Sequence, residues 1–312
     1  MSWISTALLG YFFLAVAALF DKYLLARRIK APAVYAFFVS LFSLFVLPAV
    51  PFGFRFFGWH ITGVFLLSGV LFLYGLLALY TAVKENEISR ISPLVGTVVS
   101  FVAVGVGFFP GTFSETVFSP VHILAFALLI GGGLLISFDL PLRKYEHIPL
   151  SVIVAGVAMG VSLLLLKYGY NQANFVSGLV WSRLGMFLGG LSLLLISTFR
   201  EQILGEIGAF RAVSRTVVHT GSVFVLNKIC AGSATFLIIY ATYLGPVSFV
   251  QALSGMQYVF LLLLALPLSF RYPQVFSEKM YFWDWFQKAV AIIIIGLGLG
   301  LLATSGVKLF FV

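Results

Sequence analysis

The sequence predicts an all-α integral membrane protein with ten transmembrane helices arranged as a 5+5 inverted-topology repeat. Composition is the first reason: the chain of 312 residues is 61% hydrophobic and 9% charged, with a mean hydropathy of +1.10. Soluble domains, by contrast, are about half apolar. The second reason is that apolar runs of about 20 residues, long enough to cross a ~30 Å hydrocarbon core, recur along the whole chain. The third reason is an internal duplication.

Charges, prolines and polar clusters divide the apolar runs into ten expected helices. The first run superficially resembles a signal peptide, but it has no basic n-region, so we expect it to be retained. Short segments of alternating hydrophobicity, which are typical of a membrane β-barrel, do not occur. The expected spans cover residues 3–26, 33–50, 61–83, 88–109, 119–138, 149–169, 175–198, 219–243, 246–268 and 285–306.

The duplication consists of motifs that occur in the same order in both halves of the chain. A Lys-Tyr pair that begins at Lys22 ends the first span, and a second pair that begins at Lys167 ends the sixth. Further on, "EISRISPLVG" (87–96) overlays "PVSFVQALSG" (246–255). Self-similarity in a fixed order indicates two copies of one unit.

Each copy has an odd number of spans, so the second copy enters the membrane from the opposite side. We expect residues 1–144 to form the first repeat and residues 145–312 the second, within one membrane domain. Because the positive-inside rule places basic loops in the cytoplasm, both termini are expected outside. The expected location is the cytoplasmic membrane of a prokaryote. The basic side includes Arg27, Arg28, Lys30, Arg143, Lys144, Arg200, Arg211, Arg215, Arg271, Lys279 and Lys288.

Composition also excludes several classes of function. The net charge of +9 reflects basic loops beside anionic lipid, so no nucleic-acid partner is expected. Cys230 is the single cysteine, which excludes an intramolecular disulfide and a cysteine-based metal site. A membrane-embedded enzyme needs clustered acid, base or metal-binding groups. We therefore expect no enzyme activity, no metal and no cofactor, since the histidines lie scattered near span ends: His60, His122, His147 and His219.

Several motifs resemble an EamA-like transporter of the drug/metabolite transporter (DMT) superfamily. They are "YTAVKENEISRISPLVG" (80–96), "ATYLGPVSFVQALSGMQYVFLLLLAL" (241–266), and the Ser-Glu pairs that begin at Ser114 and Ser277. The resemblance covers nearly the whole chain. It implies a ten-helix transporter that works by alternating access, with a central cavity lined by spans one to four and six to nine. Spans five and ten are peripheral in this comparison. Many such proteins keep both termini in the cytoplasm, whereas the basic residues here indicate the reverse.

Polar groups within spans are the candidate cavity residues, because a Lys or Arg at a helix centre costs about 2.5 to 3.5 kcal/mol. Arg183 lies deep in the seventh span, where it could bind substrate or bond to neighbouring carbonyls. Asn227 and Lys228 lie about a third of the way into the eighth span. Lys228 could contact substrate or reach the nearer interface, and Lys167 could do the same at the outer side.

Uncharged candidates are less specific. Gln251 and Gln257 in the ninth span could orient a ligand or form amide bonds between helices. Pro93 is expected to begin or kink the fourth span, freeing carbonyls for a cavity. Aromatic side chains could cage a ligand, although most must pack or anchor at interfaces. The aromatic candidates are Tyr35, Tyr80, Trp181, Tyr240 and Tyr258.

Two charged pairs near span ends are candidate gates. Asp21 is expected to be a local partner of Lys22, which reaches the nearby interface. Glu87 and Arg90 are three residues apart and can pair on one helical face, as a gate or as a solvated cap.

These features favour a secondary transporter for a small metabolite. Positive candidates without a mid-span carboxylate favour an anionic or zwitterionic substrate, such as an amino acid or organic acid, and disfavour a multidrug exporter. A non-transporting scaffold or a lipid-binding protein is the alternative. Glycine-rich stretches in spans five and ten, around Gly132 and Gly298, permit close helix contacts and a homodimer through these spans.

Overall fold

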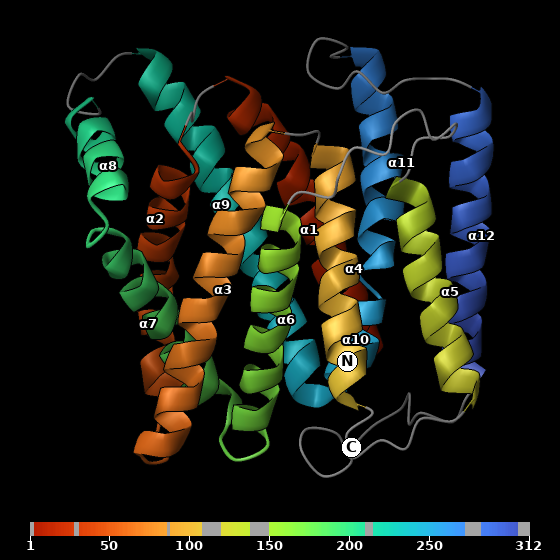
Figure 1. Ribbon diagram of the computed structural model, residues 1–312, viewed down its shortest axis with the longest axis horizontal. Helices are drawn as coiled ribbons and strands as arrows, with labels where there is room; N and C mark the ends of the chain where they lie inside the picture. The colour runs from red at the N-terminus through yellow and green to blue at the C-terminus, as the bar shows by residue number, and fades with distance from the viewer. Residues whose placement is uncertain are drawn as a thin grey trace.

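The computed structural model describes residues 3–27, 31–85, 88–107, 120–137, 150–209, 215–271 and 282–304 (Figure 1). Every regular element in these ranges is a helix. The helices are α1 (Trp3–Arg27), α2 (Pro32–Phe42), the 3-10 helix η1 (Ser43–Phe52), α3 (Trp59–Glu85), α4 (Ile88–Gly107), α5 (Pro120–Ser137), α6 (Leu150–Tyr170), α7 (Phe175–Leu193), α8 (Ser197–Ala209), α9 (Arg215–Leu244), α10 (Val247–Ala252), α11 (Gly255–Arg271) and α12 (Phe282–Thr304).

Length and composition identify six segments of the described chain that can cross a membrane, as a multi-pass membrane protein requires. The remaining sequence-predicted spans coincide with α4, α5, α10 with α11, and α12. The six segments are Trp3–Asp21, Pro32–Phe52, Trp59–Lys84, Leu150–Tyr170, Phe175–Leu193 and Ser222–Leu244.

Two of the expected spans are interrupted instead of continuous. The second changes from α2 to the 3-10 helix η1, which contains Pro48 and Pro51. A proline has no N–H to donate and its ring crowds the preceding turn, so the α-helix ends before the prolines. The ninth span breaks between α10 and α11, where the N–H of Ser254 donates to the carbonyl of Gln251 at 3.0 Å.

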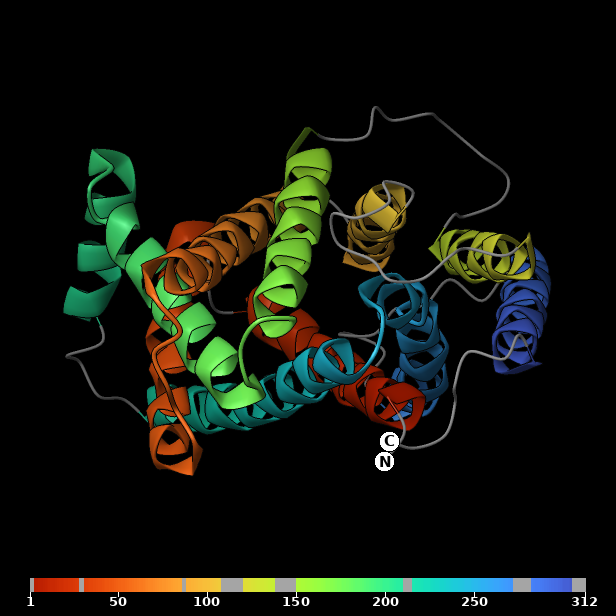
Figure 2. The same cartoon turned by 90° about the horizontal axis from the view of Figure 1, so that it is seen from below.

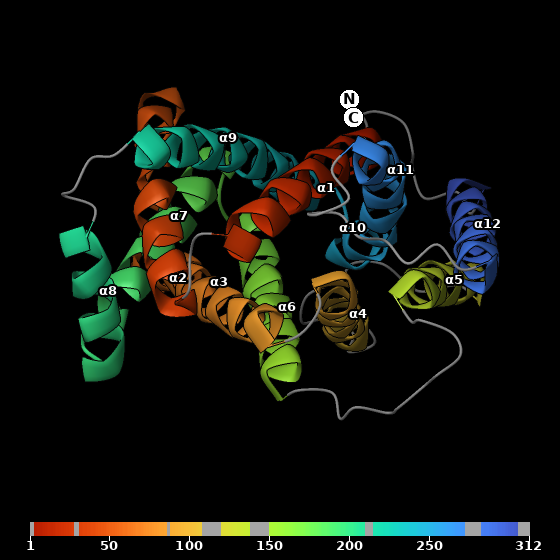
Figure 3. The ribbon, with the colours of Figure 1, turned by 90° about the horizontal axis from the view of Figure 1, so that it is seen from above.

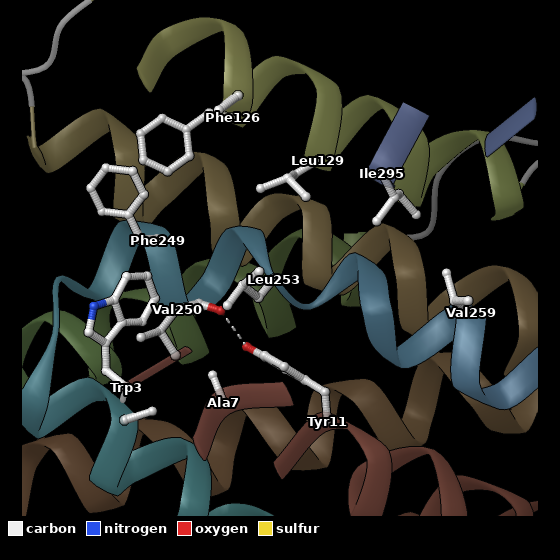
Figure 4. Packing of buried hydrophobic residues seen from close by; sticks show 12 residues of the cluster. Trp3, Ala7, Tyr11, Phe126, Leu129, Phe249, Val250, Leu253, Val259 and Ile295 are labelled. Atoms are coloured by element: carbon white, nitrogen blue, oxygen red, sulfur yellow. Dashed lines mark hydrogen bonds between the residues drawn. The ribbon is translucent and has the colours of Figure 1, made fainter. Parts of the chain in front are cut away.

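The helices α5 and α12 pack against each other at one edge of the molecule (Figures 1 and 2). A buried apolar cluster connects this edge to α1 through α10, with Leu129 and Ile295 on one side and Trp3 on the other (Figure 4). Within it, the hydroxyl of Tyr11 donates to the carbonyl of Val250 at 2.9 Å. This arrangement leaves α5 and α12 away from the centre of the helix group.

Close packing of α3 against α7 depends on glycine. A Cβ added at Gly69 would overlap the backbone oxygen of Ser182, and one added at Gly185 would overlap that of Leu66. The two backbones can therefore approach each other only because these positions carry no side chain. On the other side of the group, α9 lies along α1 (Figure 3).

Candidate functional site

A cavity of about 840 Å³ lies between the helices. Its described lining comes from α1, α2, η1, α3, α4, α6, α7, α9, α10 and α11, and no lining residue belongs to α5 or α12. These helices correspond to the first four and the sixth to ninth spans of the sequence. Most of the lining is apolar, which is usual for a small-molecule pocket with a few polar groups to fix orientation.

One charged cluster at the cavity joins three helices, and we call it the Asp21 cluster: Asp21 of α1, Tyr35 of α2, and Asn227 and Lys228 of α9. The ammonium of Lys228 lies 3.9 Å from the carboxylate of Asp21. The amide of Asn227 donates to the same carboxylate oxygen at 2.5 Å. Tyr35 also donates to this oxygen and accepts from Lys228 at 2.6 Å. A carboxylate with this many donors is well compensated for its removal from water.

Aromatic rings hold the Asp21 cluster in position. The Nζ atom of Lys228 lies 4.3 Å from the ring centroid of Tyr35 and 5.0 Å from that of Phe224. The rings of Tyr35 and Tyr80 meet edge to face at 4.6 Å. Cation–π attraction and ring packing therefore restrict the ammonium to the cavity side of α9. Tyr80 and Lys228 both line the cavity.

Arg183 of α7 also lines the cavity. Its guanidinium donates to the sulfur of Met186 at 3.5 Å, and its backbone carbonyl accepts from the hydroxyl of Ser43 at 2.9 Å. Among the residues that the structure describes, no carboxylate forms an ion pair with it. The ionisable cations and carboxylates in the described lining are Asp21, Arg183 and Lys228, so two cations face one carboxylate and leave one positive charge in excess.

Neutral polar groups complete the lining. Ser68 of α3 and Ser162 of α6 each donate to the other's backbone carbonyl at 2.8 Å. Gln251 and Gln257 line the cavity on both sides of the α10–α11 break. Gln251 is buried, and its backbone carbonyl accepts a bond of 3.3 Å from the hydroxyl of Ser100 of α4. The described lining thus offers side-chain amides and hydroxyls as well as charge.

Lys167 does not belong to the cavity lining. Its ammonium donates to the backbone carbonyls of Thr242, Tyr243 and Gly245, at 3.1, 3.3 and 3.0 Å. Two of these carbonyls belong to the last turn of α9, where no intrahelical donor follows. Lys167 therefore neutralises the C-terminal end of α9.

Two further aromatic candidates, Trp181 and Tyr240, do not gather with Tyr35 around one ligand position. Trp181 packs against Phe54 and Phe56 beyond η1. Tyr240 packs against Phe175 of α7, with ring centroids 5.1 Å apart. Tyr35, Trp181 and Tyr240 therefore belong to three separate ring groups, and the cage expected from the sequence is not formed by them.

Some sequence candidates lie outside the described residues or have side chains outside them. Glu87 is outside, as are the side chains of Lys22, Arg90, Pro93 and Tyr258. The helix α4 begins at Ile88, so Pro93 does not begin it. In the part of the chain that the structure describes, no group of His, Cys, Asp or Glu side chains could hold a metal ion.

The structure corrects the expected role of Asp21. Sequence analysis placed it near a span end as a local partner of Lys22, but it lines the cavity and pairs with Lys228. The helix α1 continues for six residues beyond Asp21, to Arg27. The apolar residues "YLLA" after Lys22 were the available signal, because they indicate that the helix does not end at the charges.

Comparison with known proteins supports the fold alone. No family model matches the chain, and no curated protein matches it. A solved structure known as "Crystal structure of protein" is similar, with a TM-score of 0.66 and 15% sequence identity. The similarity covers 97% of this chain and 99% of that chain. The whole arrangement of helices is therefore shared with a protein of experimentally determined structure.

Proposed function

We propose that the protein is a secondary transporter that moves a small anionic or zwitterionic metabolite through the central cavity. The observation that carries this proposal is Arg183, a guanidinium in the cavity wall with no ion-pair partner among the described residues. An unpaired guanidinium gains more from an incoming carboxylate or phosphate than a guanidinium that already has an ion-pair partner. Guanidinium binds both of these anions in a bidentate manner. The cavity volume of about 840 Å³ suits a small metabolite.

Pairwise packing supports the proposed inverted repeat. Exchanging the halves would relate α1 on α9 to α6 on α3, and both pairs are packed closely. The α5–α12 pair would be related to itself. The same exchange would relate the contact between α3 and α7 to a contact between α9 and α2. The contact between α9 and α2, however, is far smaller than that between α3 and α7. Inverted repeats in two unequal arrangements are a common basis of alternating access, so this inequality supports a mechanism in which the two arrangements exchange.

The finer assignments belong to the same proposal. The chain would have ten spans, with basic loops in the cytoplasm, both termini outside, and membership of the EamA-like DMT transporters. Span five and span ten would be free to form a homodimer. Accessibility of single cysteines introduced at Arg55 and Arg200, in a Cys230→Ser background, tests the sidedness. The rule of basic loops predicts that only the cysteine at position 55 reacts with an impermeant thiol reagent from outside.

A ligand screen of the purified protein in nanodiscs tests the substrate class. A ligand at a hundred times its dissociation constant should add about 2.7 kcal/mol to the free energy of unfolding. We expect organic acids, amino acids or phosphorylated metabolites to stabilise the wild type, and Arg183→Ala to lose this effect. Arg55→Ala is the matched control, because Arg55 is exposed and outside the cavity lining.

Two outcomes contradict the proposal. Stabilisation by lipophilic cations alone would overturn the preference for anions. Equal stabilisation of wild type and Arg183→Ala by an anion would remove Arg183 from the site.

A further inference from the structure

The cavity wall formed by α9 has an unusual exposure. Ser222–Leu244 can cross a membrane, and 17% of its apolar 18-residue window is buried, against 44% for the window of Trp3–Asp21 and 56% for that of Phe175–Leu193. It packs mainly against α1 (Figure 3). On the α1 side Asn227 and Ala234 are fully buried. The opposite side of α9 therefore has little protein to cover it.

Residues on that opposite side line the cavity and are also exposed. They follow helical spacing along α9, and the most exposed large one, Ile229, has 60% of its surface accessible. Across from them Phe45 of η1 lines the same cavity and is 75% exposed. Large accessible fractions on two facing walls of the cavity indicate an opening between them. The exposed lining residues of α9 are Val225, Ile229, Gly232, Ser233 and Phe236.

Aromatic contacts bound this opening along α9. Toward the start of α9, the rings of Phe224 and Phe42 have centroids 5.6 Å apart. Toward its end, Phe236 meets Phe175 of α7 at 5.4 Å. Between these contacts lies the stretch from Val225 to Ser233, about 12 Å of helix at 1.5 Å per residue. Both walls belong to segments that can cross a membrane, so the opening faces lipid hydrocarbon.

We propose that this opening, the α9–η1 portal, receives the apolar chain of a membrane-dissolved amphipathic anion whose head group binds Arg183. The inference rests on the proposed function and narrows its substrate class. Charge complementarity supports it, because the portal leads into a cavity with one positive charge in excess. The geometry also supports it: Ser43, two residues before Phe45, bonds to the backbone of Arg183 at 2.9 Å. The portal wall therefore lies beside the backbone of Arg183, whose side chain also lines the cavity. An apolar chain between Phe45 and Ile229 would remain in hydrocarbon while its head group enters the cavity.

A blocked portal tests the inference. Gly232 is the suitable position, because a Cβ added there meets no atom within 4 Å, so Gly232→Trp fills the portal without displacing backbone. Gly296→Trp on α12 is the matched control, since a Cβ there is equally unhindered and Gly296 lies outside the cavity lining. Binding of decyl phosphate and methyl phosphate is measured with each protein in phosphatidylcholine nanodiscs.

We expect the wild type to bind decyl phosphate at least tenfold more tightly than methyl phosphate, since each buried CH₂ contributes about fourfold. Gly232→Trp should weaken the binding of decyl phosphate at least tenfold and leave the binding of methyl phosphate unchanged. Gly296→Trp should change the binding of neither ligand, and the contrast with Gly232→Trp excludes simple partitioning into the bilayer. Arg183→Ala should weaken the binding of both ligands, which would place the phosphate head group at Arg183.

Three results would overturn the portal. One is decyl phosphate binding that is equal in wild type and Gly232→Trp. Another is equal weakening of both phosphates by Gly232→Trp, which would make the opening a general entrance for polar ligands and leave the proposed transporter intact. The third is phosphate binding with no preference for the long chain. If instead Arg183→Ala binds both phosphates like the wild type, the proposed function fails as well.

Discussion

The Asp21 cluster and Lys167 hold α9 at two levels by different chemistry. In the first half of α9, Lys228 meets a carboxylate, a phenol hydroxyl and an aromatic ring. At its end, Lys167 meets three backbone carbonyls. Residues 228 and 242 are separated by about 20 Å along the helix at 1.5 Å per residue. One lysine therefore has side-chain partners, and the other has main-chain partners.

This difference indicates which contact can change in the proposed transport. A carboxylate pairs with whichever cation is near, so a substrate bearing an ammonium or a carboxylate can replace one member of the Asp21–Lys228 pair. The carbonyls at the end of α9 have no such alternative in a membrane, where an unsatisfied backbone group costs several kcal/mol. We therefore expect the Asp21 cluster to open and close, and the Lys167 contact to persist.

Removing one member of the ion pair should have the largest effect. Lys228→Met leaves Asp21 partly buried without its cation, and breaking such a pair costs about 3 kcal/mol. The double variant Asp21→Asn/Lys228→Met should recover more than half of this loss, because no charge is left uncompensated. Reversible unfolding in detergent measures both. A double variant that is less stable than the single variant would show that Lys228 has another essential partner.

Removing Lys167 should have an intermediate effect that no partner substitution rescues. Lys167→Met leaves the carbonyls of Thr242, Tyr243 and Gly245 without this donor, and an unsatisfied buried acceptor costs about 1 to 3 kcal/mol. Lys167→Arg should restore most of the stability, because a guanidinium also presents several donors. The same unfolding measurement applies. An arginine variant as unstable as the methionine variant would contradict a role limited to donating hydrogen bonds.

Removing only the phenol hydroxyl should have the smallest effect. Tyr35→Phe keeps the ring against Tyr80 and Lys228 but loses the bonds to Asp21 and from Lys228, at a net cost of about 1 kcal/mol. Tyr11→Phe is the control, because it loses a buried hydroxyl bond, to the carbonyl of Val250, away from the Asp21 cluster. Substrate affinity should change in Tyr35→Phe and not in Tyr11→Phe. Equal affinity in both variants would separate Tyr35 from ligand binding.

The helices were predictable from the sequence because length and apolar composition determine them directly. Arg183 and Lys228 were identifiable for a related reason: charge within an apolar run is costly and needs a partner or a function. The Asp21–Lys228 pair was not predictable, because it depends on how α1 packs on α9 across most of the chain. The same holds for Lys167, whose acceptors are backbone atoms that leave no mark in the side-chain pattern.

The two helix interruptions also differ in whether the sequence predicts them. Pro48 and Pro51 signal the change to η1, whereas the α10–α11 break carries no proline and is stabilised by tertiary contacts such as that between Ser100 and Gln251. The portal depends on the absence of packing along one side of α9, and composition alone does not reveal such an absence.

Substrate flux through purified protein in proteoliposomes tests the central claim most directly. The probe is the anion or zwitterion that stabilises the wild type most in the ligand screen, or decyl phosphate if the long-chain preference is found. The account predicts saturable uptake by wild type and Arg55→Ala, with at least a tenfold loss in Arg183→Ala protein that remains folded. Uptake by Arg183→Ala equal to that of the wild type, or binding without any flux, would contradict a transporter that uses this cavity.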